Sequence, residues 1–241
     1  MLFNNAGIGG GGSFVTDDRR AWEKTFNVCW GGVYNCSRAF MPMLVAADAG
    51  HLVNTSSVNG FWASIGPGLP HSAYSAAKFA VKGFTEALVT DLRLTAPHVK
   101  CSVVMPGHIG TGIMANSRKL QTGNATDTLS PGEIAKARAR VAMVNPAAAH
   151  LPDAEIQRLL IERERSFEAD APMMSAEAAT IILDGVKADR WRILVGKDAD
   201  RLDAMVRANP EDAYEADFYQ KLTSDVGWRL GMAPASAKPK S

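Results

Sequence analysis

The sequence is poor in cysteine, and its three cysteines are not arranged as a metal site. Cys29, Cys36 and Cys101 show no metal-ligand spacing. An odd and sparse set of cysteines is typical of a reducing compartment rather than of a secreted protein held by disulfides. We therefore expect a cytoplasmic protein without a bound metal, and we interpret Cys36 and Cys101 as small buried side chains.

Long apolar runs and an excess of one sign of charge are also missing. No stretch of 18 or more apolar residues occurs, which argues against a membrane span. The 26 basic and 25 acidic residues give a formal net charge of +1, which argues against nucleic acid or an anionic membrane as a partner. The N-terminus shows no basic region followed by an apolar stretch, and hence no secretory signal.

The composition that is left belongs to an ordinary globular protein. The chain has 241 residues, of which 46% are hydrophobic and 21% are charged, enough for one domain with a sizeable core. We expect a single domain over residues 1–232 and a flexible tail at 233–241.

Short apolar runs alternate with helical patterns along the chain. The predicted strands are Met1–Phe3, His51–Asn54, Lys100–Met105 and Arg192–Val195. Segments with apolar residues at helical spacing lie at 17–44, 75–94 and 175–187. This alternation predicts an α/β fold with a parallel sheet, whose sites lie at the carboxyl ends of the strands.

Two further segments carry weaker signals. Residues 112–170 are charged and rich in alanine, with breaks at Pro131, Pro146 and Pro152. We interpret this segment as helices that cover a site rather than as a second domain. The chain from Asn209 onward is polar.

The strongest chemical pattern is Tyr74 and Lys78, four residues apart at a predicted helix start. Side chains at this spacing project from one helix face. A phenol has an ordinary pKa of about 10, and a nearby ammonium favours the phenolate and lowers that pKa. A tyrosine tuned in this way can exchange a proton with an alcohol or carbonyl oxygen. The spacing alone also fits an ordinary surface pair.

Other polar signals accompany this pair. Ser57 follows a predicted strand, and its hydroxyl could contact the same substrate oxygen. Ser64 is a second serine that could take this role, whereas Ser56 faces the opposite side of the strand. The first predicted strand runs into Asn4-Asn5-Ala6-Gly7, which includes small residues. The predicted strand Lys100–Met105 is followed by Pro106-Gly107-His108-Ile109-Gly110-Thr111.

Together these segments resemble the short-chain dehydrogenase/reductase family. The resemblance is close over residues 2–111 and resumes at 175–196. It implies a Rossmann-like, doubly wound parallel sheet and hydride transfer between NAD or NADP and an alcohol or ketone. It also implies a homodimer or homotetramer, formed through the helices at 17–44 and 75–94.

The resemblance implies a role for each matching residue. Tyr74 would be the general acid/base, Lys78 would lower its pKa and bind the nicotinamide ribose, and Ser57 would orient the substrate oxygen. The cofactor-binding residues would be Asn5, Ala6, Gly7, Tyr74, Lys78, Pro106, Gly107, Ile109 and Thr111.

The chain departs from the family at its start. The family begins with a strand, a glycine-rich phosphate loop and a helix, so the first βαβ portion is expected to be lacking before Asn4. The run Gly7–Gly12 fits G-x-G-x-x-G, but no acidic residue follows about 20 residues on, as such a fingerprint requires. We therefore interpret this run as a flexible loop.

Two more departures lie closer to the chemistry. Cys29 stands where family members usually have an asparagine that holds a water in a proton relay, and Asn27 points to another side of the helix. A thiol is a weak donor and acceptor, so either water substitutes or the activity is slow or lost. The insert at 61–70, between Ser57 and Tyr74, is expected to bulge beside the substrate pocket.

Two alternatives stay open. The chain could be a catalytically impaired fragment that acts only as a dimerising or interaction module. A hydrolase using Ser57 with His71 is disfavoured, because no G-x-S-x-G elbow surrounds the serine. His71 and His108 flank the site and are interpreted as pocket walls.

Overall fold

A computed structural model describes residues 1–67, 69–124, 126–228 and 230. The tail expected at 233–241 and Gly68 of the insert lie outside the described residues. Among those that are described, no helix combines the length and the apolar character that crossing a membrane requires.

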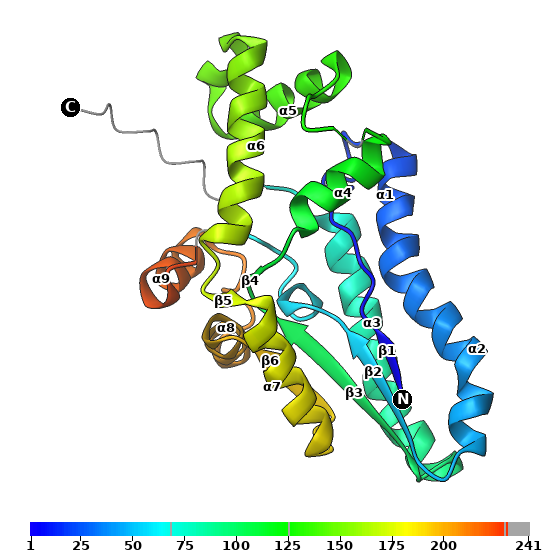
Figure 1. Ribbon diagram of the computed structural model, residues 1–241. Helices are drawn as coiled ribbons and strands as arrows, with labels where there is room; N and C mark the ends of the chain where they lie inside the picture. The colour runs from blue at the N-terminus through cyan, green and yellow to red at the C-terminus, as the bar shows by residue number, and fades with distance from the viewer. Residues whose placement is uncertain (68, 125, 229, 231–241) are drawn as a thin grey trace.

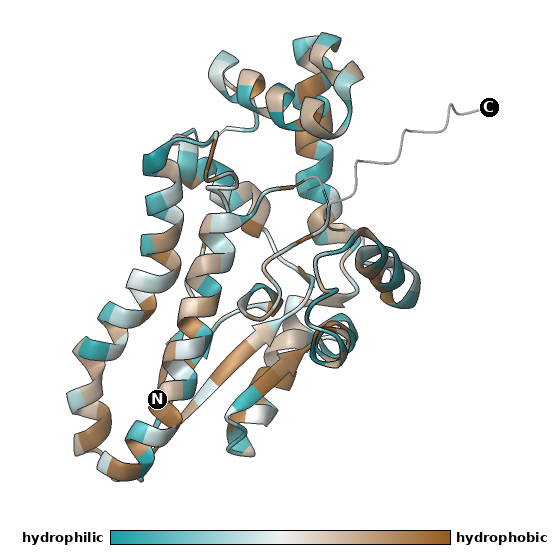
Figure 2. Ribbon diagram, turned by 180° about the vertical axis from the view of Figure 1, so that it is seen from behind, coloured by the Kyte–Doolittle hydropathy of each residue, from teal (hydrophilic) through white to brown (hydrophobic). Residues whose placement is uncertain are grey.

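Four parallel strands form the central sheet in the order β1-β2-β3-β6 (Figure 1). They are β1 (Leu2–Asn4), β2 (Gly50–Thr55), β3 (Val99–Pro106) and β6 (Arg192–Val195). Each predicted strand is confirmed, with ends that differ by at most one residue. The strands are among the most hydrophobic segments of the molecule (Figure 2), as expected for strands that are buried on both faces.

Helices cover both faces of this sheet. They are α1 (Arg19–Phe26), α2 (Gly32–Ala46), α3 (Ser72–Thr95) and α7 (Ser175–Lys187). The alternation of side chains along β2 divides the core, because Leu52 packs against α2 and α3 while Val53 packs against α7. The predicted α/β fold with a parallel sheet is therefore confirmed.

The helix predicted over 17–44 is interrupted. A π-helical turn at Asn27–Gly31 separates α1 from α2, and a π turn in a helix often marks a functional site. The interpretation of Cys36 as buried is wrong, because Cys36 lies exposed on α2 while the neighbouring Ser37 turns inward and accepts a hydrogen bond from Asn4. Cys101 is buried, as predicted.

Three helices form what we call the helical cap, residues 113–169. They are α4 (Ile113–Thr122), α5 (Pro131–Val144) and α6 (Asp153–Ala169), with a 3-10 turn at Pro146–His150. Short strands β4 (Ile109–Gly110) and β5 (Met173–Met174) pair at its base. The cap lies beyond the carboxyl ends of the sheet strands (Figure 1), so the helices predicted at 112–170 are present.

The C-terminal region holds two helices that the sequence did not reveal, α8 (Lys197–Ala208) and α9 (Ala216–Val226). Their buried residues have helical spacing but are few, and two of those in α8, Asp198 and Asp203, are acidic, so an apolar pattern does not stand out. Phe218 and Leu222 of α9 pack with Trp62 in one core cluster. The expectation that the insert at 61–70 bulges beside a substrate pocket is thus wrong for Trp62, which is buried beneath α9.

The glycine-rich run after β1 is packed, not free. Gly10 and Gly11 have φ values of +128° and +58°, and a Cβ on Gly11 would lie 2.7 Å from the Cα of Trp22. The backbone N–H groups of Ser72 and Ala73 donate to the carbonyl oxygens of Gly12 and Gly11. This run therefore holds the start of α3 against α1, which corrects the interpretation of a flexible loop.

Two glycine substitutions are expected to have opposite effects. Gly11→Ala should lower the free energy of unfolding by about 1–3 kcal/mol, because its φ is positive and its Cβ position is already filled. Gly83→Ala is the matched control, since Gly83 lies in α3 with open space around it. It should raise stability by about 0.5–1 kcal/mol. Urea unfolding of both variants measures the difference, and equal effects would contradict this account of the loop.

Candidate active site

Ser57 is placed by the end of β2. Its backbone is extended, and its side-chain oxygen accepts a hydrogen bond from the backbone N–H of Asn59 at 3.1 Å, which caps the 3-10 turn Val58–Gly60. The Ser57 side chain also lies close enough to Tyr74 to lower the pKa of its phenol. The strand end and the start of α3 thus bring together two of the residues predicted from the sequence.

The other serines are directed elsewhere. Ser56 donates to the carbonyl oxygen of Lys78 at 2.7 Å, on the opposite side from Ser57, as expected. Ser64 accepts from the N–H of Gly66 through its side chain and from Asn59 through its carbonyl oxygen. Ser64 therefore takes part in a turn and does not replace Ser57.

Tyr74 and Lys78 lie one turn apart on α3. The Lys78 ammonium nitrogen is 5.4 Å from the centroid of the Tyr74 ring and donates to the carbonyl oxygen of Thr55 at 2.9 Å. Lys78 is 3% exposed. A Cβ on Gly7 would lie 3.5 Å from the Lys78 nitrogen, so the absence of a side chain at Gly7 leaves space beside the ammonium.

The pKa of Tyr74 moves opposite to the sequence prediction. Burial raises the pKa of its phenol, the nearby Cys29 thiol raises it further, and the neighbouring Ser57 side chain lowers it in part. Burial also lowers the pKa of the Lys78 ammonium. The predicted lowering of the Tyr74 pKa by Lys78 is not found, because the cost of desolvating a phenolate outweighs the attraction.

Cys29 lies in the π-helical turn and faces the same site. The backbone N–H of Ile8 donates to the Cys29 sulfur at 3.5 Å, and the thiol donates to the Ile8 carbonyl oxygen at 3.2 Å. Both functions of the thiol are thus used to bind the segment after β1, which leaves none for a proton relay. Asn27 is exposed, as its place on the helix predicts.

The end of β1 places the first predicted cofactor residues. Asn4 is buried and donates to Ser37 and Asn54 at 3.0 and 2.8 Å, which fixes the strand end. Asn5 accepts from the hydroxyl of Thr55 at 3.0 Å. Ala6 is exposed and Gly7 half-buried, so both lie at the surface of the site near Lys78.

The turn after β3 closes the other side of the site. Gly107 donates to the carbonyl oxygen of Val195 at 2.9 Å, and the backbone N–H of His108 donates to Asp198 at 2.6 Å. The imidazole of His108 bonds the carbonyl oxygen of Phe167 on α6 at 2.7 Å, which fits its interpretation as a wall residue. Pro106, Ile109 and Thr111 are half-buried.

Asp198 is a site residue that sequence reasoning missed. It begins α8, is 4% exposed, and holds the turn at His108. A Cβ on Gly107 would overlap its carboxylate, so Gly107 must be a glycine for this contact to form. Burial raises the pKa of Asp198. The available signal was an acidic residue two positions after Gly196, at a helix start where carboxylates are favoured.

His71 lies directly before the site helix. Its ring centroid is 4.9 Å from that of Tyr74. Burial lowers the pKa of His71 to about 4, and the positive charges of Arg140 and Arg163 lower it further in the same direction. No hydrogen bond joins His71 to Ser57 within residues 1–67 and 69–124, which removes the geometric basis of the hydrolase alternative.

The low pKa of His71 has a consequence for acid stability. The unfolded chain takes up a proton near the ordinary pKa of 6.5, whereas the folded protein resists it until about pH 4. The free energy of unfolding should therefore fall as the pH drops from 6.5 toward 4, by up to about 1.4 kcal/mol per pH unit. NMR titration of His71 and denaturation of His71→Gln across this range measure it. A His71 that titrates near 6.5 would contradict it.

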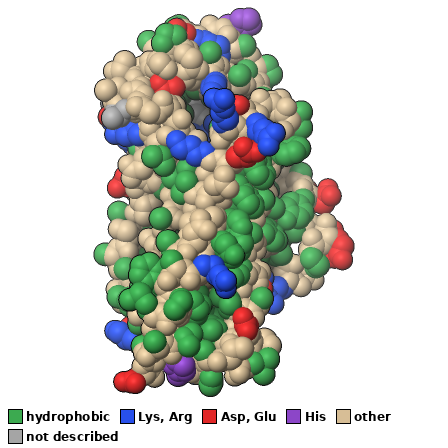
Figure 3. Space-filling model, turned by 90° about the vertical axis from the view of Figure 1, so that its right-hand side faces the viewer, with side chains coloured by type: hydrophobic (Ala, Val, Ile, Leu, Met, Phe, Trp, Pro, Cys, Tyr) green, Lys and Arg blue, Asp and Glu red, His purple; other side chains and the backbone are tan. Residues whose placement is uncertain are grey.

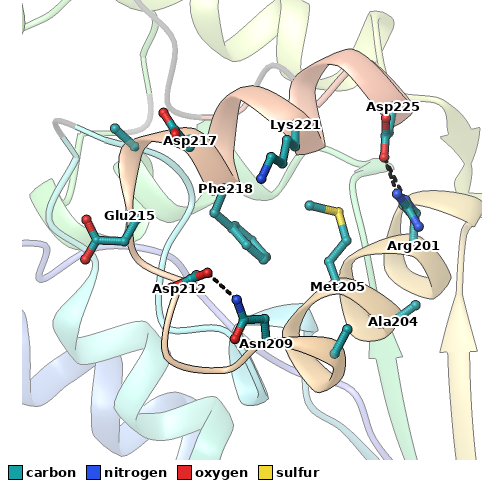
Figure 4. Close-up of a pocket in the computed structure, with 12 residues that line it drawn as sticks. Arg201, Ala204, Met205, Asn209, Asp212, Glu215, Asp217, Phe218, Lys221 and Asp225 are labelled. Atoms are coloured by element: carbon teal, nitrogen blue, oxygen red, sulfur yellow. Dashed lines mark hydrogen bonds and ion pairs between the residues drawn. The ribbon is translucent and has the colours of Figure 1, made fainter.

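A surface pocket lies apart from these residues. It has a volume of about 750 Å³ and opens between α8 and α9 (Figure 4). Met205 and Phe218 contribute apolar surface, and Arg201 pairs with Asp225 at its rim at 2.8 Å. None of the predicted catalytic residues lines it, so its size does not make it the active site.

Comparison with known proteins decides the family. A sequence profile for short chain dehydrogenases matches residues 1–122 of the 241. The chain belongs to the short-chain dehydrogenase/reductase family. The match includes Ser57, Tyr74 and Lys78, as well as the turn at 106–111.

Several relatives show how much of the family's length this chain spans. SadH of Mycobacterium tuberculosis is 31% identical over 208 residues, which are 86% of this chain and 61% of SadH. The 3-ketodihydrosphingosine reductase of Bacteroides thetaiotaomicron is 36% identical over 117 residues, 48% of this chain and 41% of the reductase.

Solved structures agree with this assignment. A short chain dehydrogenase/reductase from Burkholderia phymatum, in complex with NAD, matches with a TM-score of 0.62 and 28% identity, over 88% of this chain and 65% of that one. A short chain dehydrogenase from Burkholderia cenocepacia, at 19% identity and a TM-score of 0.59, shares the fold. The chain therefore spans less than two thirds of the length of SadH and of the Burkholderia phymatum protein.

Proposed function

We propose that this chain carries the catalytic site of an oxidoreductase that transfers a hydride between NAD or NADP and an alcohol or ketone. One observation carries the proposal: Ser57 and Tyr74 lie close enough for the Ser57 side chain to lower the pKa of the Tyr74 phenol, and the Lys78 ammonium nitrogen is 5.4 Å from the centroid of the Tyr74 ring. Two hydroxyl groups next to a buried ammonium can hold a carbonyl oxygen and supply its proton.

The roles of the two hydroxyl groups follow from their surroundings. Burial keeps Tyr74 protonated at neutral pH, so it is suited to donate its proton to the oxygen of a ketone. Ser57 is fixed by Asn59 and can donate a second hydrogen bond to that oxygen. In the reverse reaction Tyr74 accepts the proton of the alcohol.

The residues present fit the nicotinamide-ribose end of a dinucleotide. The buried Lys78 ammonium has three donors and, within the described residues, one acceptor, Thr55. Two N–H groups are left for ribose hydroxyls, and Gly7 leaves room for them. When bound, NAD or NADP supplies the hydride. The packed glycines at 9–12 do not form a phosphate cradle.

The remaining predicted contacts complete this proposal. We assign Asn5, Ala6 and Gly7 to the adenosine-ribose side of the cofactor and Pro106, Gly107, Ile109 and Thr111 to its nicotinamide end. The helical cap would cover the substrate at the carboxyl ends of the sheet strands. The NAD found in the Burkholderia phymatum relative supports the cofactor class.

A homo-oligomer is the second part of the proposal. Exposed apolar side chains gather on α2 and α3, at Tyr34, Phe40, Met43, Val45, Phe79 and Leu94. Figure 3 shows hydrophobic side chains running down the face that includes α1 and α2. Such a surface is typical of a subunit contact, and it favours a homodimer or homotetramer. The same surface supports the alternative of a dimerising module without activity.

Cofactor titration separates these two functions. Binding of NADH or NADPH, followed by nicotinamide fluorescence, should saturate below millimolar concentration. Lys78→Met should weaken it by at least tenfold, because it removes the buried ammonium. Lys82→Met is the matched control, since Lys82 lies one turn further along α3 and pairs with Glu86. A dimer that binds neither nucleotide at millimolar concentration would leave only the dimerising module.

A further inference from the structure

Most arginines of the helical cap whose contacts are defined have a carboxylate partner, and one stands out. Arg118 on α4 is buried against Glu164 at 2.8 Å, Arg138 pairs with Asp153, and Arg140 reaches Asp17 at 3.0 Å. Within the part of the chain that the structure describes, Arg163 and Arg165 on α6 have neither an ion pair nor a side-chain hydrogen bond. Arg165 is exposed to solvent, whereas Arg163 is half-buried.

Arg163 lies on the face of α6 that packs against the turn after β3. It lies one turn before Phe167, and residues four apart share a helix face. The ring of Phe167 is 4.5 Å from that of His108, in the turn that closes the site. Arg163 is also half-buried, although no carboxylate accounts for its burial.

Three positive or titratable groups meet at this place. Arg140 and Arg163 are both close enough to His71 to lower its pKa, and Arg140 lowers the pKa of Arg163. Asp17 neutralises Arg140, so the charge of Arg163 is left over. His71 itself is next to Tyr74 and lines a groove of about 740 Å³ between the glycine-rich run and α3. Figure 3 shows Lys and Arg side chains around a hollow at the upper end of its face.

An unpaired guanidinium that is partly removed from water lowers stability, and an anion beside it restores the lost interactions. Guanidinium binds carboxylate and phosphoryl oxygens through two parallel hydrogen bonds. His71 stays neutral in this environment, so the arginine is the group left to bind an anion.

We propose that Arg163 binds an anionic group of the substrate, a carboxylate or a phosphoryl, while the alcohol or ketone of the same molecule lies at Ser57 and Tyr74. This inference rests on the proposed function for the position of the reacting oxygen. The substrate class is then an oxo or hydroxy compound that carries a negative charge at its other end.

Paired probes test the inference by binding as well as by turnover. We would compare 4-oxopentanoate, 5-oxohexanoate and 7-oxooctanoate with their methyl esters, and 2-oxopropylphosphonate with its diethyl ester. The acid of at least one pair should bind about tenfold or more tightly than its ester, by calorimetry. A larger ratio of acid affinity to ester affinity for the carboxylates, or for the phosphonate, shows which of the two anions the site prefers.

Variants show whether Arg163 is responsible. Arg163→Gln and Arg163→Met should remove the preference for the acid, and the second keeps the apolar stem of the side chain. Arg165→Gln is the control, because Arg165 is an exposed arginine on the same helix and its loss should leave the preference intact. Circular dichroism verifies that each variant is folded.

The outcomes separate this inference from the proposed function. A preference for the acid that disappears only in the Arg163 variants supports the anion site, even if no hydride transfer is detected. No preference in the unmodified chain, or a preference that survives both Arg163 variants, overturns the anion site. Turnover of neutral ketones without any such preference would leave the proposed function standing alone.

Discussion

Tyr74→Phe should lower the rate of hydride transfer by about 10²–10⁴-fold, the range for loss of a general acid. The change removes one oxygen atom and keeps the ring that packs beside His71 and Lys78. The fold should therefore stay the same, and cofactor affinity should fall far less than the rate. Steady-state assays of ketone reduction, with cofactor binding measured on the same sample, provide the test.

A control is available on the neighbouring helix. Tyr34 is a second tyrosine, exposed on α2, and Tyr34→Phe should retain the unmodified rate. If the Tyr74→Phe variant turned over within tenfold of the unmodified chain, Tyr74 would lose its assigned role. If cofactor affinity fell as much as the rate, the hydroxyl would act mainly in binding the cofactor, and the assignment as general acid would be wrong.

Trp62→Ala should lower the free energy of unfolding by about 3–5 kcal/mol, as expected for removing a large buried aromatic side chain. Trp62 is 2% exposed and lies between Phe218 and Trp228, with ring centroids 5.8 and 6.0 Å away. Its indole N–H donates to the carbonyl oxygen of Ala213 at 2.6 Å. The loss should release α9 and disturb the turn after Ser57.

Trp191→Ala is the matched control for this substitution. Trp191 is 42% exposed, so its loss should change the free energy of unfolding by about 0.5 kcal/mol, which is ordinary for a surface site. Urea denaturation followed by circular dichroism measures both variants. Similar midpoints for the two would mean that the cluster beneath α9 does not hold the C-terminal helices to the sheet.

Much of the fold could be predicted because the strands carry short, dense apolar runs. Burial on both faces selects Leu52, Val53, Val103 and Val104, and the ends of such runs are sharp. The site could be found because Tyr74 and Lys78 are four residues apart at a predicted helix start and Ser57 follows a predicted strand. These signals are local in the sequence.

The features that were missed depend on contacts between distant segments. The packing of α9 on Trp62 joins residues 156 positions apart, and the sequence around Phe218 does not indicate that contact. The π turn at Asn27–Gly31 places Cys29 against Ile8, which lies 21 positions earlier. The pKa of Tyr74 depends on how deeply the fold buries the phenol. The spacing of residues in the sequence does not indicate that depth.

The hydrogen bonds between Cys29 and Ile8 also allow the local opening of the segment after β1 to be measured. Cys29 is fully buried while Cys36 is exposed, so a thiol reagent should label Cys36 at once and Cys29 only during brief openings. When reclosing outpaces labelling, the ratio of the two rates equals the equilibrium constant for opening. The buried Cys101, in the sheet core, should report global unfolding instead. The labelling rates of Cys36, Cys29 and Cys101 thus report, in that order, the intrinsic reactivity, the local opening and the global unfolding of the protein.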